Sequence, residues 1–292
     1  MFLADYHVHP GYSLDAEDRS IDEYCQQALR LGLSEICFTP HYECDPVRQN
    51  IDWFVRVNGK VTPMDRWSWI DLYFTEIAAA RQQYAKSGLA VKAGIEIGYD
   101  FGLEPVIEKL INNYPWDFIL GSIHCLDHMA ISSSRESVNY FPGRTARQVC
   151  DDYYNKVKAA VASGLFDCLG HLDIYQRYGH RFFGPEIEEV ELPLAESVLK
   201  QMAASNIGME INTSGLRKGY HCFPSSKILK LAAQCGVKIF TIGSDAHKKS
   251  DLGQGLVQAV KMLKQNKLNL YCFSRRVPTP VSTGEAMADK SM

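Results

Sequence analysis

The sequence predicts an α/β fold in which parallel strands form a single closed or nearly closed barrel, with helices on its outer face. Short apolar runs alternate with longer amphipathic stretches almost from end to end, which is the pattern of repeated β-α units. No shift in composition divides the 292 residues, of which 46% are hydrophobic and can supply one large core. A parallel sheet of this size needs helices over its outer face, which favours a barrel.

The elements follow from this alternation. The predicted strands lie near residues 3–8, 34–39, 91–97, 117–123, 167–170, 208–212 and 238–243. The predicted helices lie near residues 20–31, 67–87, 103–113, 145–163, 186–205, 225–235 and 251–265. A final apolar piece, Leu268 to Phe273, is either an eighth strand or a packing tail. We therefore expect one domain over residues 1–275.

Three segments do not fit the alternation. Residues 42–66 and 125–144 are too long to be simple connections. Both follow a predicted strand, so in a barrel both would lie over the face at which active sites are found. Residues 276–292 are rich in Pro, Ser, Thr and Ala and lack periodicity, and we expect this tail to be disordered.

The composition excludes several classes of protein. The net charge is -3 and the pI about 6.3, with basic residues spread along the chain, which argues against a general nucleic-acid surface. The first residues contain neither a basic nor an apolar leader, and no apolar run has the length of a membrane span. The nine cysteines form no CxxC pair, so we expect thiols in a reducing cytoplasm.

The first candidate for chemistry is a pair of histidines at the end of the first predicted strand. His7 and His9 are spaced by two, which places both imidazoles on one face of the strand, where they could share a metal ion. Alone this motif is a weak signal, because a bare HxH arises easily in a chain with nine histidines.

Further ligand-type residues stand at equivalent positions. Glu96 lies within an apolar strand, where an unpaired carboxylate would be costly to bury and a metal ion would remove that cost. The other strand-end positions are His41, His124, His171, Asp245 and His247. Such ends converge on one pocket in a barrel, and core packing does not generate this pattern. The sequence therefore predicts a metal centre.

The ligand set also indicates the chemistry. Histidine and carboxylate without cysteine suit zinc, iron or manganese, and more donors are present than one tetrahedral ion needs, which predicts two or three ions. Such a cluster lowers the pKa of a bound water and neutralises charge on a phosphoryl group, so hydrolysis is expected. Motifs of other chemistries, GxGxxG after the first strand, GxxxxGK[ST], HExxH and GxSxG, are absent from the sequence.

With these positions in hand, the sequence resembles the PHP (polymerase and histidinol phosphatase) family. Six motifs match in order: Asp5-Tyr6-His7-Val8-His9, Thr39-Pro40-His41, Gly94-Ile95-Glu96, Gly121-Ser122-Ile123-His124, Gly170-His171-Leu172-Asp173 and Gly243-Ser244-Asp245-Ala246-His247. The resemblance implies a distorted (β/α)7 TIM-like barrel with a trinuclear metal site at the carboxyl ends of its strands.

The resemblance also implies which residues hold each ion. His7, His9, Glu96 and Asp245 would hold the first ion. Glu96, as a bridge, would hold the second together with His124 and His171. Asp15, His41 and His247 would hold the third. Asp15 comes from the resemblance alone, because an aspartate in a polar loop is usually only solvated.

Two segments resemble the histidinol-phosphatase branch of this family. They are Asn212 to Lys218 and Phe223-Pro224-Ser225, whereas Gly219 to Cys222 departs from the pattern, which includes an acidic residue there. This branch implies hydrolysis of L-histidinol phosphate to L-histidinol and phosphate in histidine biosynthesis. We expect a metal-bridging hydroxide as nucleophile, with no residue assigned as the acid.

A phosphomonoester also requires cations beside its non-bridging oxygens, and the fork of arginine fits phosphate well. Arg177 and Arg217 are the candidates. The spare histidines His128, His180 and His221 lie near the expected mouth of the pocket. They could donate a proton to the leaving alcohol, but we expect them to have no catalytic role.

Three alternatives remain open at this point. Another PHP phosphoesterase could act on nucleotides, oligonucleotide ends or phosphotyrosine, although the lack of a basic track counts against a nuclease. A metal-dependent amidohydrolase or deaminase can also open with an HxH motif, but would lack the motifs around His41 and His124. A metal-stabilised binding module would show decayed ligands, whereas all nine positions here carry competent donors.

Overall fold

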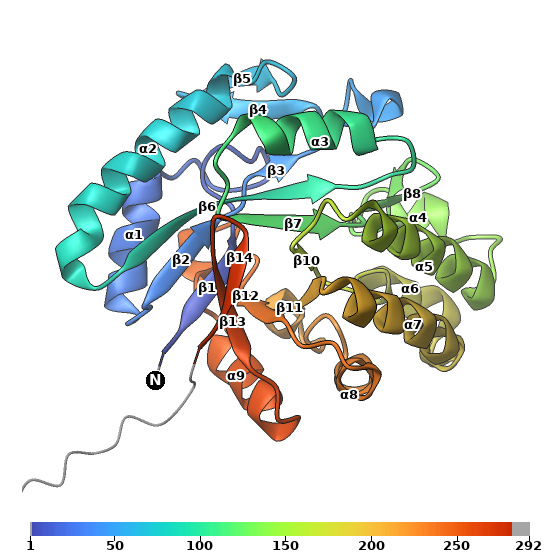
Figure 1. Ribbon diagram of the computed structural model, residues 1–292. Helices are drawn as coiled ribbons and strands as arrows, with labels where there is room; N and C mark the ends of the chain where they lie inside the picture. The colour runs from blue at the N-terminus through green and yellow to red at the C-terminus, as the bar shows by residue number, and fades with distance from the viewer. Residues whose placement is uncertain (1, 282–292) are drawn as a thin grey trace, which may run out of the picture.

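The computed structural model describes residues 2–281, which form a central sheet with helices on its outside (Figure 1). The strands of this sheet are β1 (Ala4–Val8), β2 (Glu35–Phe38), β3 (His41–Tyr42), β6 (Ala90–Gly98), β7 (Phe118–Ser122), β10 (Cys168–Leu169), β11 (Gly208–Asn212), β12 (Phe240–Gly243), β13 (Leu270–Ser274) and β14 (Val277–Val281). Their order is β1-β2-β6-β7-β10-β11-β12-β13-β14, and β3 pairs with β6. All pairs are parallel except β13 with β14. The predicted α/β class and parallel sheet are confirmed.

The helices agree with the predicted amphipathic stretches. They are α1 (Ile21–Arg30), α2 (Ser68–Tyr84), α3 (Glu104–Asn113), α5 (Ala146–Ser163), α7 (Glu186–Ser205), α8 (Ser226–Cys235) and α9 (Leu256–Gln265). Capping boxes at Ser20 and Thr145 fix the starts of α1 and α5, because each side chain satisfies a free N–H of the first turn. Two short helices, α4 (Ser137–Tyr140) and α6 (Gln176–Phe183), were not predicted, since neither is long enough to show a clear period.

The sheet is curved, so that its first strand returns to the segment that follows β12. The main-chain N–H of His9 donates to the carbonyl of Ala246 at 3.0 Å, and the N–H of Ala246 donates to the carbonyl of His7 at 3.2 Å. Val8 and Ala246 form a single parallel bridge rather than a ladder. Within residues 2–281 the strand ladder is therefore open, running from β1 to β14.

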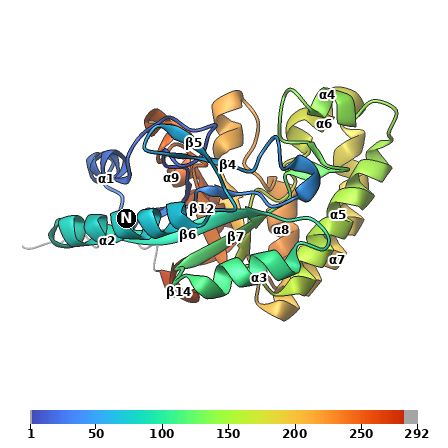
Figure 2. The ribbon, with the colours of Figure 1, turned by 90° about the horizontal axis from the view of Figure 1, so that it is seen from above.

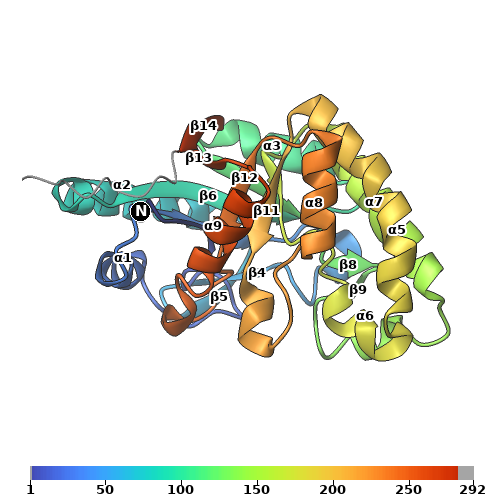
Figure 3. The same cartoon turned by 90° about the horizontal axis from the view of Figure 1, so that it is seen from below.

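The two long connections lie over the carboxyl ends of the strands, as expected. They contain the hairpins β4 (Phe54–Val57) with β5 (Lys60–Pro63), and β8 (Cys125–Leu126) with β9 (Met129–Ala130). Figures 2 and 3 show β4, β5 and α6 toward one end of the molecule and β14 toward the opposite end. Arg48 joins the two connections, because its guanidinium donates to Glu136 at 2.7 and 2.9 Å and to the carbonyl of His128 at 2.7 Å.

The predicted disorder of residues 276–292 is wrong for the part that the structure describes. Residues 277–281 form β14, an edge strand that pairs with β13, and the apolar piece Leu268 to Phe273 supplies β13 as an eighth strand. Pro278 and Pro280 are tolerated because β14 has a neighbour on one side only. Residues 282–292 lie outside the described part of the chain.

The nine cysteines are free thiols, and most of them are buried. Across residues 2–281, the helices are too short or too polar to cross a bilayer.

Candidate metal centre

The carboxyl ends of the strands bring the predicted histidines together. His7 and His9 flank the last residue of β1, and both are fully buried, with ring centroids 5.0 Å apart. The ring of His9 lies 4.1 Å from the ring of His41, which follows β2, and 4.1 Å from the ring of His247, which follows β12. Four imidazoles from three chain segments therefore share one buried volume.

Glu96, a fully buried residue of β6, stands at the centre of this group. Its Oε2 atom lies 3.2 Å from Nε2 of His7, 3.5 Å from Nε2 of His9 and 2.9 Å from Nδ1 of His41. One carboxylate oxygen thus faces three imidazole nitrogens, which is the crowding expected of a shared ligand.

The second oxygen of Glu96 faces a different pair of histidines. Its Oε1 atom lies 3.1 Å from Nε2 of His124, which follows β7, and 3.0 Å from Nε2 of His171, which follows β10. The hydroxyl of Ser122 donates to the same oxygen at 2.6 Å. Glu96 therefore points its two oxygens at two separate histidine groups, as a bridging carboxylate would.

Two aspartates complete the group. Oδ1 of Asp245 lies 3.7 Å from Nε2 of His7, 3.4 Å from Nε2 of His9 and 3.3 Å from Nδ1 of His247. Oδ2 of Asp15 lies 3.1 Å from Nε2 of His247, at the more exposed edge of the group. All nine positions singled out from the sequence therefore lie in one cluster.

The donor atoms of this cluster are arranged for a cation. Several buried atoms that face one another have no hydrogen-bond partner among the described residues: Nε2 of His7, Nε2 of His9, Nδ1 of His41 and Oε2 of Glu96. A buried polar atom without a partner is costly, and a metal ion removes that cost. Among the sets of donor atoms that lie within 4.8 Å of one another, three consist of the predicted positions alone: His7, His9 and Asp245; Glu96, His124 and His171; and His9, His41 and His247. A further set joins His41 and His124 to Glu43. The residues present fit divalent ions.

The electrostatics keep the carboxylates of the cluster ionised. Burial alone would raise the pKa of Glu96, but the imidazoles of His7, His124 and His41 hold this pKa well below its usual range. Burial also opposes ionisation of Asp245, whose pKa His7 nevertheless holds well below the usual range. Both carboxylates are therefore in the charged form that coordinates metals.

The histidines divide into two kinds. Burial, helped by His247 and His41, lowers the pKa of His9 well below its usual value, so this ring is neutral and can coordinate. Burial would also lower the pKa of His41, but Asp15 and Glu96 raise it to about 9. Burial opposes protonation of His247 as well, yet Asp15 raises its pKa to about 10. Metal ions would displace the protons from these last two rings.

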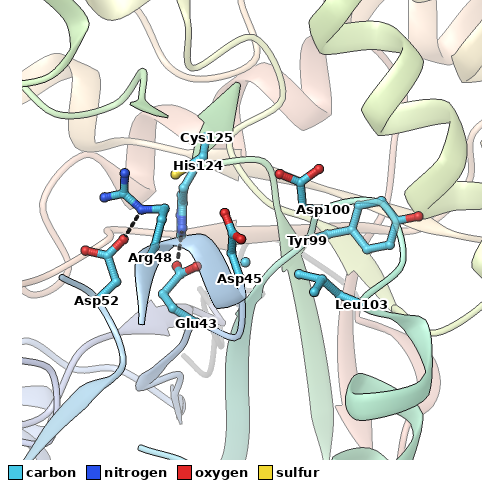
Figure 4. Close-up of a pocket in the computed structure, with 10 residues that line it drawn as sticks. Glu43, Asp45, Arg48, Asp52, Tyr99, Asp100, Leu103, His124 and Cys125 are labelled. Atoms are coloured by element: carbon cyan, nitrogen blue, oxygen red, sulfur yellow. Dashed lines mark hydrogen bonds and ion pairs between the residues drawn. The ribbon is translucent and has the colours of Figure 1, made fainter. Parts of the chain in front are cut away.

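Two carboxylates that the sequence analysis did not single out hold the outer nitrogens of two histidines. Oε1 of Glu210 lies 2.8 Å from Nδ1 of His7. Oε1 of Glu43 lies 2.7 Å from Nδ1 of His124, as Figure 4 shows. Glu210 carries the same signal as Glu96, an acidic residue inside an apolar strand, whereas Glu43 lies in an irregular connection without such a signal.

An open cavity of about 670 Å³ lies over the cluster, a volume in the range of small-molecule sites. Its wall includes the proposed ligands Asp15, His41, Glu96, His124, His171, Asp245 and His247. The long connections add apolar and hydroxyl groups such as Phe54, Met64 and Ser132. A neighbouring pocket of about 10 Å³, drawn in Figure 4, has room for only about one water molecule. A substrate would therefore occupy the larger cavity.

The two candidate arginines lie in different places. Arg177 is on the cavity wall, where its Nη2 donates to Ser214 at 2.8 Å and its buried Nε has no partner among the described residues. Arg217 is not among the residues that line this cavity, and its guanidinium donates to the carbonyls of Ser244 at 2.6 Å and Asp245 at 2.9 Å. These placements support Arg177 as an anion-binding residue and give Arg217 a structural contact.

Besides Arg177, the cavity wall carries three cations that the sequence analysis did not single out: Arg48, Arg135 and Lys218. Of these, Arg48 is paired with Asp52 and Glu136.

The spare histidines are not among the residues that line the cavity in the described part of the chain. His128 lies 2.6 Å from Oδ2 of Asp45, and His180 lies 3.1 Å from Oε1 of Glu188. These contacts hold His128 and His180 with carboxylates, and the absence of a catalytic role for the spare histidines stays a prediction.

Comparison with known proteins places this geometry in a family. The model of the PHP domain matches residues 5–214, a span that contains seven of the nine clustered positions. The chain belongs to the PHP domain family.

Curated relatives of this PHP protein are histidinol-phosphatases. A probable histidinol-phosphatase of Deinococcus radiodurans is 31% identical over 279 residues, which cover 95% of this chain and 99% of that protein. The histidinol-phosphatase of Lactococcus lactis subsp. lactis is 25% identical, with 83% of each chain covered.

Solved structures of PHP proteins share the fold. The crystal structure of histidinol phosphate phosphatase from Lactococcus lactis, complexed with zinc, L-histidinol and phosphate, matches with a TM-score of 0.76 and 22% identity, covering 95% of this chain and 98% of that chain. A putative histidinol phosphatase from Listeria monocytogenes matches with a TM-score of 0.74 and 22% identity, covering 87% of this chain and 99% of that chain. The predicted resemblance is therefore confirmed.

Proposed function

We propose that this PHP protein is a metal-dependent phosphomonoesterase that hydrolyses L-histidinol phosphate to L-histidinol and phosphate in histidine biosynthesis. The observation that carries the proposal is the set of buried, unpartnered histidine and carboxylate atoms that converges on Glu96. The names of the curated relatives, which align along nearly the whole chain, support the choice of substrate. The substrate is a small molecule, in keeping with a cavity of about 670 Å³.

The proposed centre holds two or three divalent ions, which would be zinc, manganese or iron. His7, His9, Glu96 and Asp245 would hold one ion. His124 and His171 would hold a second with Glu96 as the bridge. Asp15, His41 and His247 would hold the third. The short approach of β1 to the segment after β12, at Val8 and Ala246, supports an incompletely closed barrel as the frame of this centre. The frame is one domain over the predicted residues 1–275, extended by β14 (Val277–Val281).

Bound divalent ions lower the pKa of water and neutralise charge on phosphoryl oxygens. The chain supplies the remaining functions. Arg177 presents a guanidinium to the cavity and would bind a non-bridging oxygen of the phosphate, with Lys218 as a further positive charge on the same wall. Phe54 and Met64 offer apolar surface to the organic part of the substrate.

A substrate panel tests the proposal. Phosphate release would be measured with L-histidinol phosphate, nucleotides, a phosphotyrosine peptide and a single-stranded oligonucleotide, together with the metal content of the same preparation. The proposal expects kcat/KM of about 10⁴ M⁻¹s⁻¹ or more for L-histidinol phosphate alone. Activity confined to the oligonucleotide or the peptide would assign the protein to another branch. No release from any substrate by the metal-loaded protein would overturn the proposal.

A further inference from the structure

Glu210 lies directly behind the candidate centre without belonging to its ligand set. The residue is in the middle of β11 and its exposed fraction is 1%. Its Oε1 atom lies 2.8 Å from Nδ1 of His7, and its Oε2 atom accepts the main-chain N–H of His171 at 2.9 Å. One buried carboxylate therefore contacts two of the proposed ligands, which come from opposite sides of β11 in the fold.

The neighbouring strands leave room for this carboxylate. A Cβ atom at Gly243, the last residue of β12, would overlap Oε1 of Glu210 and the Cβ of His7. A Cβ atom at Gly170, which follows β10, would lie 3.4 Å from Oε2 of Glu210 and 2.7 Å from the hydroxyl of Ser122. Gly243 thus leaves the space through which the carboxylate reaches His7, whereas a Cβ atom at Gly170 would collide with Ser122 rather than with Glu210.

The contact with His7 determines which nitrogen faces the centre. A carboxylate only accepts hydrogen bonds, so when the ring of His7 is neutral its proton stays on Nδ1, toward Glu210. The amide nitrogen of Asn212 is farther from Nδ1, at 3.4 Å, and donates to Glu210 at 3.1 Å. The Nε2 atom of His7 then keeps its lone pair, and it is the buried atom that lies 3.2 Å from Glu96 without a hydrogen bond. The acceptor behind the ring thus produces the tautomer that can coordinate a metal.

The contact with His171 acts on the main chain. His171 has a φ of 26°, a positive value that residues with side chains rarely adopt. The hydrogen bond from its N–H to Glu210 satisfies a buried donor in this unusual conformation. In that conformation Nε2 of His171 lies 3.0 Å from Oε1 of Glu96. Glu210 therefore supports both the ring of one ligand and the backbone of another.

Glu43 repeats the arrangement on the open side of the cluster. Its Oε1 atom lies 2.7 Å from Nδ1 of His124, whose Nε2 faces Glu96 at 3.1 Å, and the labelled pair is seen in Figure 4. A Cβ atom at Gly98 would overlap the carboxylate of Glu43, so a glycine again makes room. The side chain of Glu43 is 18% exposed, so solvent can partly replace it.

We propose that Glu210 and Glu43 are positioning residues. They fix the tautomers of His7 and His124, and Glu210 also holds the main chain of His171, so that the Nε2 atoms of all three ligands meet the metal ions. This inference rests on the proposed function, because it requires the metal centre. Glu43 also lines the cavity, whereas Glu210 is not among its described lining residues, so zinc affinity rather than turnover reports the role of Glu43. Each acts through a histidine.

The Glu210→Gln substitution tests the inference with little change in shape. The amide has one acceptor oxygen, so it cannot accept from both the His7 ring and the His171 main chain. We expect the dissociation constant for zinc, measured by competition with a chromophoric chelator, to rise about 10- to 100-fold. Phosphate release should recover as zinc is added in excess, which a merely structural defect would not allow. Glu43→Gln should show the same change with a smaller amplitude, and it remains informative if the first variant does not fold.

Glu35→Gln is the matched control, because Glu35 is also a buried carboxylate but lies at the amino end of β2, hydrogen-bonded to Tyr6. Its zinc affinity should equal that of the wild type. Unchanged zinc affinity in both Glu210→Gln and Glu43→Gln would overturn the inference while leaving the proposed function intact. An equal loss in Glu35→Gln would also overturn it. A wild-type protein that binds no metal would overturn the proposed function and the inference together.

Discussion

The two ends of the central sheet both bury charged groups, but only one end satisfies them from within the chain. At the amino end, Asp117 pairs with Arg81 and accepts the N–H of Ala93 at 2.9 Å and that of Arg275 at 3.2 Å. At the carboxyl end, histidine and carboxylate atoms face one another, and several have no hydrogen-bond partner among the described residues. The amino end is built for stability, whereas the carboxyl end is arranged for a cation that the chain does not supply.

The turn between β13 and β14 reinforces the amino end. Arg276 donates from Nε to Asp167 at 2.9 Å, and Asp167 accepts the N–H of Ile119 at 2.7 Å. The carboxylate ahead of β10 is thereby tied to the last hairpin of the described chain. If the comparison holds, substitutions at this end should change stability, and substitutions at the other end should change metal binding and turnover.

Removing the first two histidines should have the largest effect. The double variant His7→Ala and His9→Ala takes away two buried donors, so metal content should fall and release of phosphate from L-histidinol phosphate should drop to background. The fold should remain, as judged by far-UV circular dichroism and a cooperative thermal transition. His180→Ala, which changes a histidine outside the cavity wall, should keep wild-type turnover. Retained turnover in the double variant would contradict the account.

Arg177→Met should have the next largest effect, because it removes the guanidinium from the cavity wall but keeps an unbranched side chain. We expect kcat/KM for L-histidinol phosphate to fall about 100-fold, with unchanged metal content, measured by steady-state kinetics. Arg147→Met, at an exposed arginine of α5 that pairs with Asp151, should have no effect. Equal kinetics in the two variants would remove Arg177 from the site.

Asp117→Ala tests the amino end. The change leaves Arg81 and the N–H groups of Ala93 and Arg275 without their acceptor, so the free energy of unfolding in urea should fall by about 3 kcal/mol. Turnover per folded molecule should stay at the wild-type value. A loss of turnover in the folded variant would show that the two ends are not independent.

Asp167→Asn tests the amino end through pH, with an effect that develops only as the pH rises from about 4 to about 6. Burial raises the pKa of Asp167 to about 6, although Arg276 and the N–H of Ile119 oppose this rise. Between these two pKa values the folded protein holds a proton on this carboxyl, whereas the unfolded chain has released it. The stability that the protonated carboxyl contributes is therefore present below the unfolded pKa of 3.8 and is lost as the pH rises through about 6.

The free energy of unfolding would be measured by urea titration of metal-depleted protein at about pH 4 and at about pH 6. Between these values the free energy should fall more in the wild type than in Asp167→Asn, and the difference between the two losses should be up to about 3 kcal/mol. Asp151→Asn, at a residue that pairs with Arg147 on the surface, should follow the wild type. Parallel curves for wild type and Asp167→Asn would show that burial does not raise this pKa.

The fold was largely predictable because its signals are local and repeated. Each predicted strand is an apolar run, and α7 has the predicted bounds 186–205. The β13–β14 hairpin was missed because its turn, Arg275-Arg276, lacks glycine and asparagine. These residues adopt φ values of 50° and 64°, which usually require other residue types, and their contacts with Asp117 and Asp167 come from distant segments.

The site was predictable for a different reason. Ligand-type residues that follow apolar strands mark the carboxyl ends directly, so all the clustered positions except Asp15 were visible from the residues alone. The choice between Arg177 and Arg217 was not predictable, because it depends on where α6, which follows β10, and the 3-10 helix Ser214–Lys218, which follows β11, place these side chains. Glu43 was missed for the same reason, since only the folded chain brings it to His124.

A metal titration of depleted protein tests the central claim most directly. Zinc or manganese would be added stepwise to protein stripped with a chelator, while phosphate release from L-histidinol phosphate and bound metal per chain are measured together. The account predicts no release without metal and a rise that levels off at two or three ions per chain. Release at the full rate by the depleted protein would contradict it.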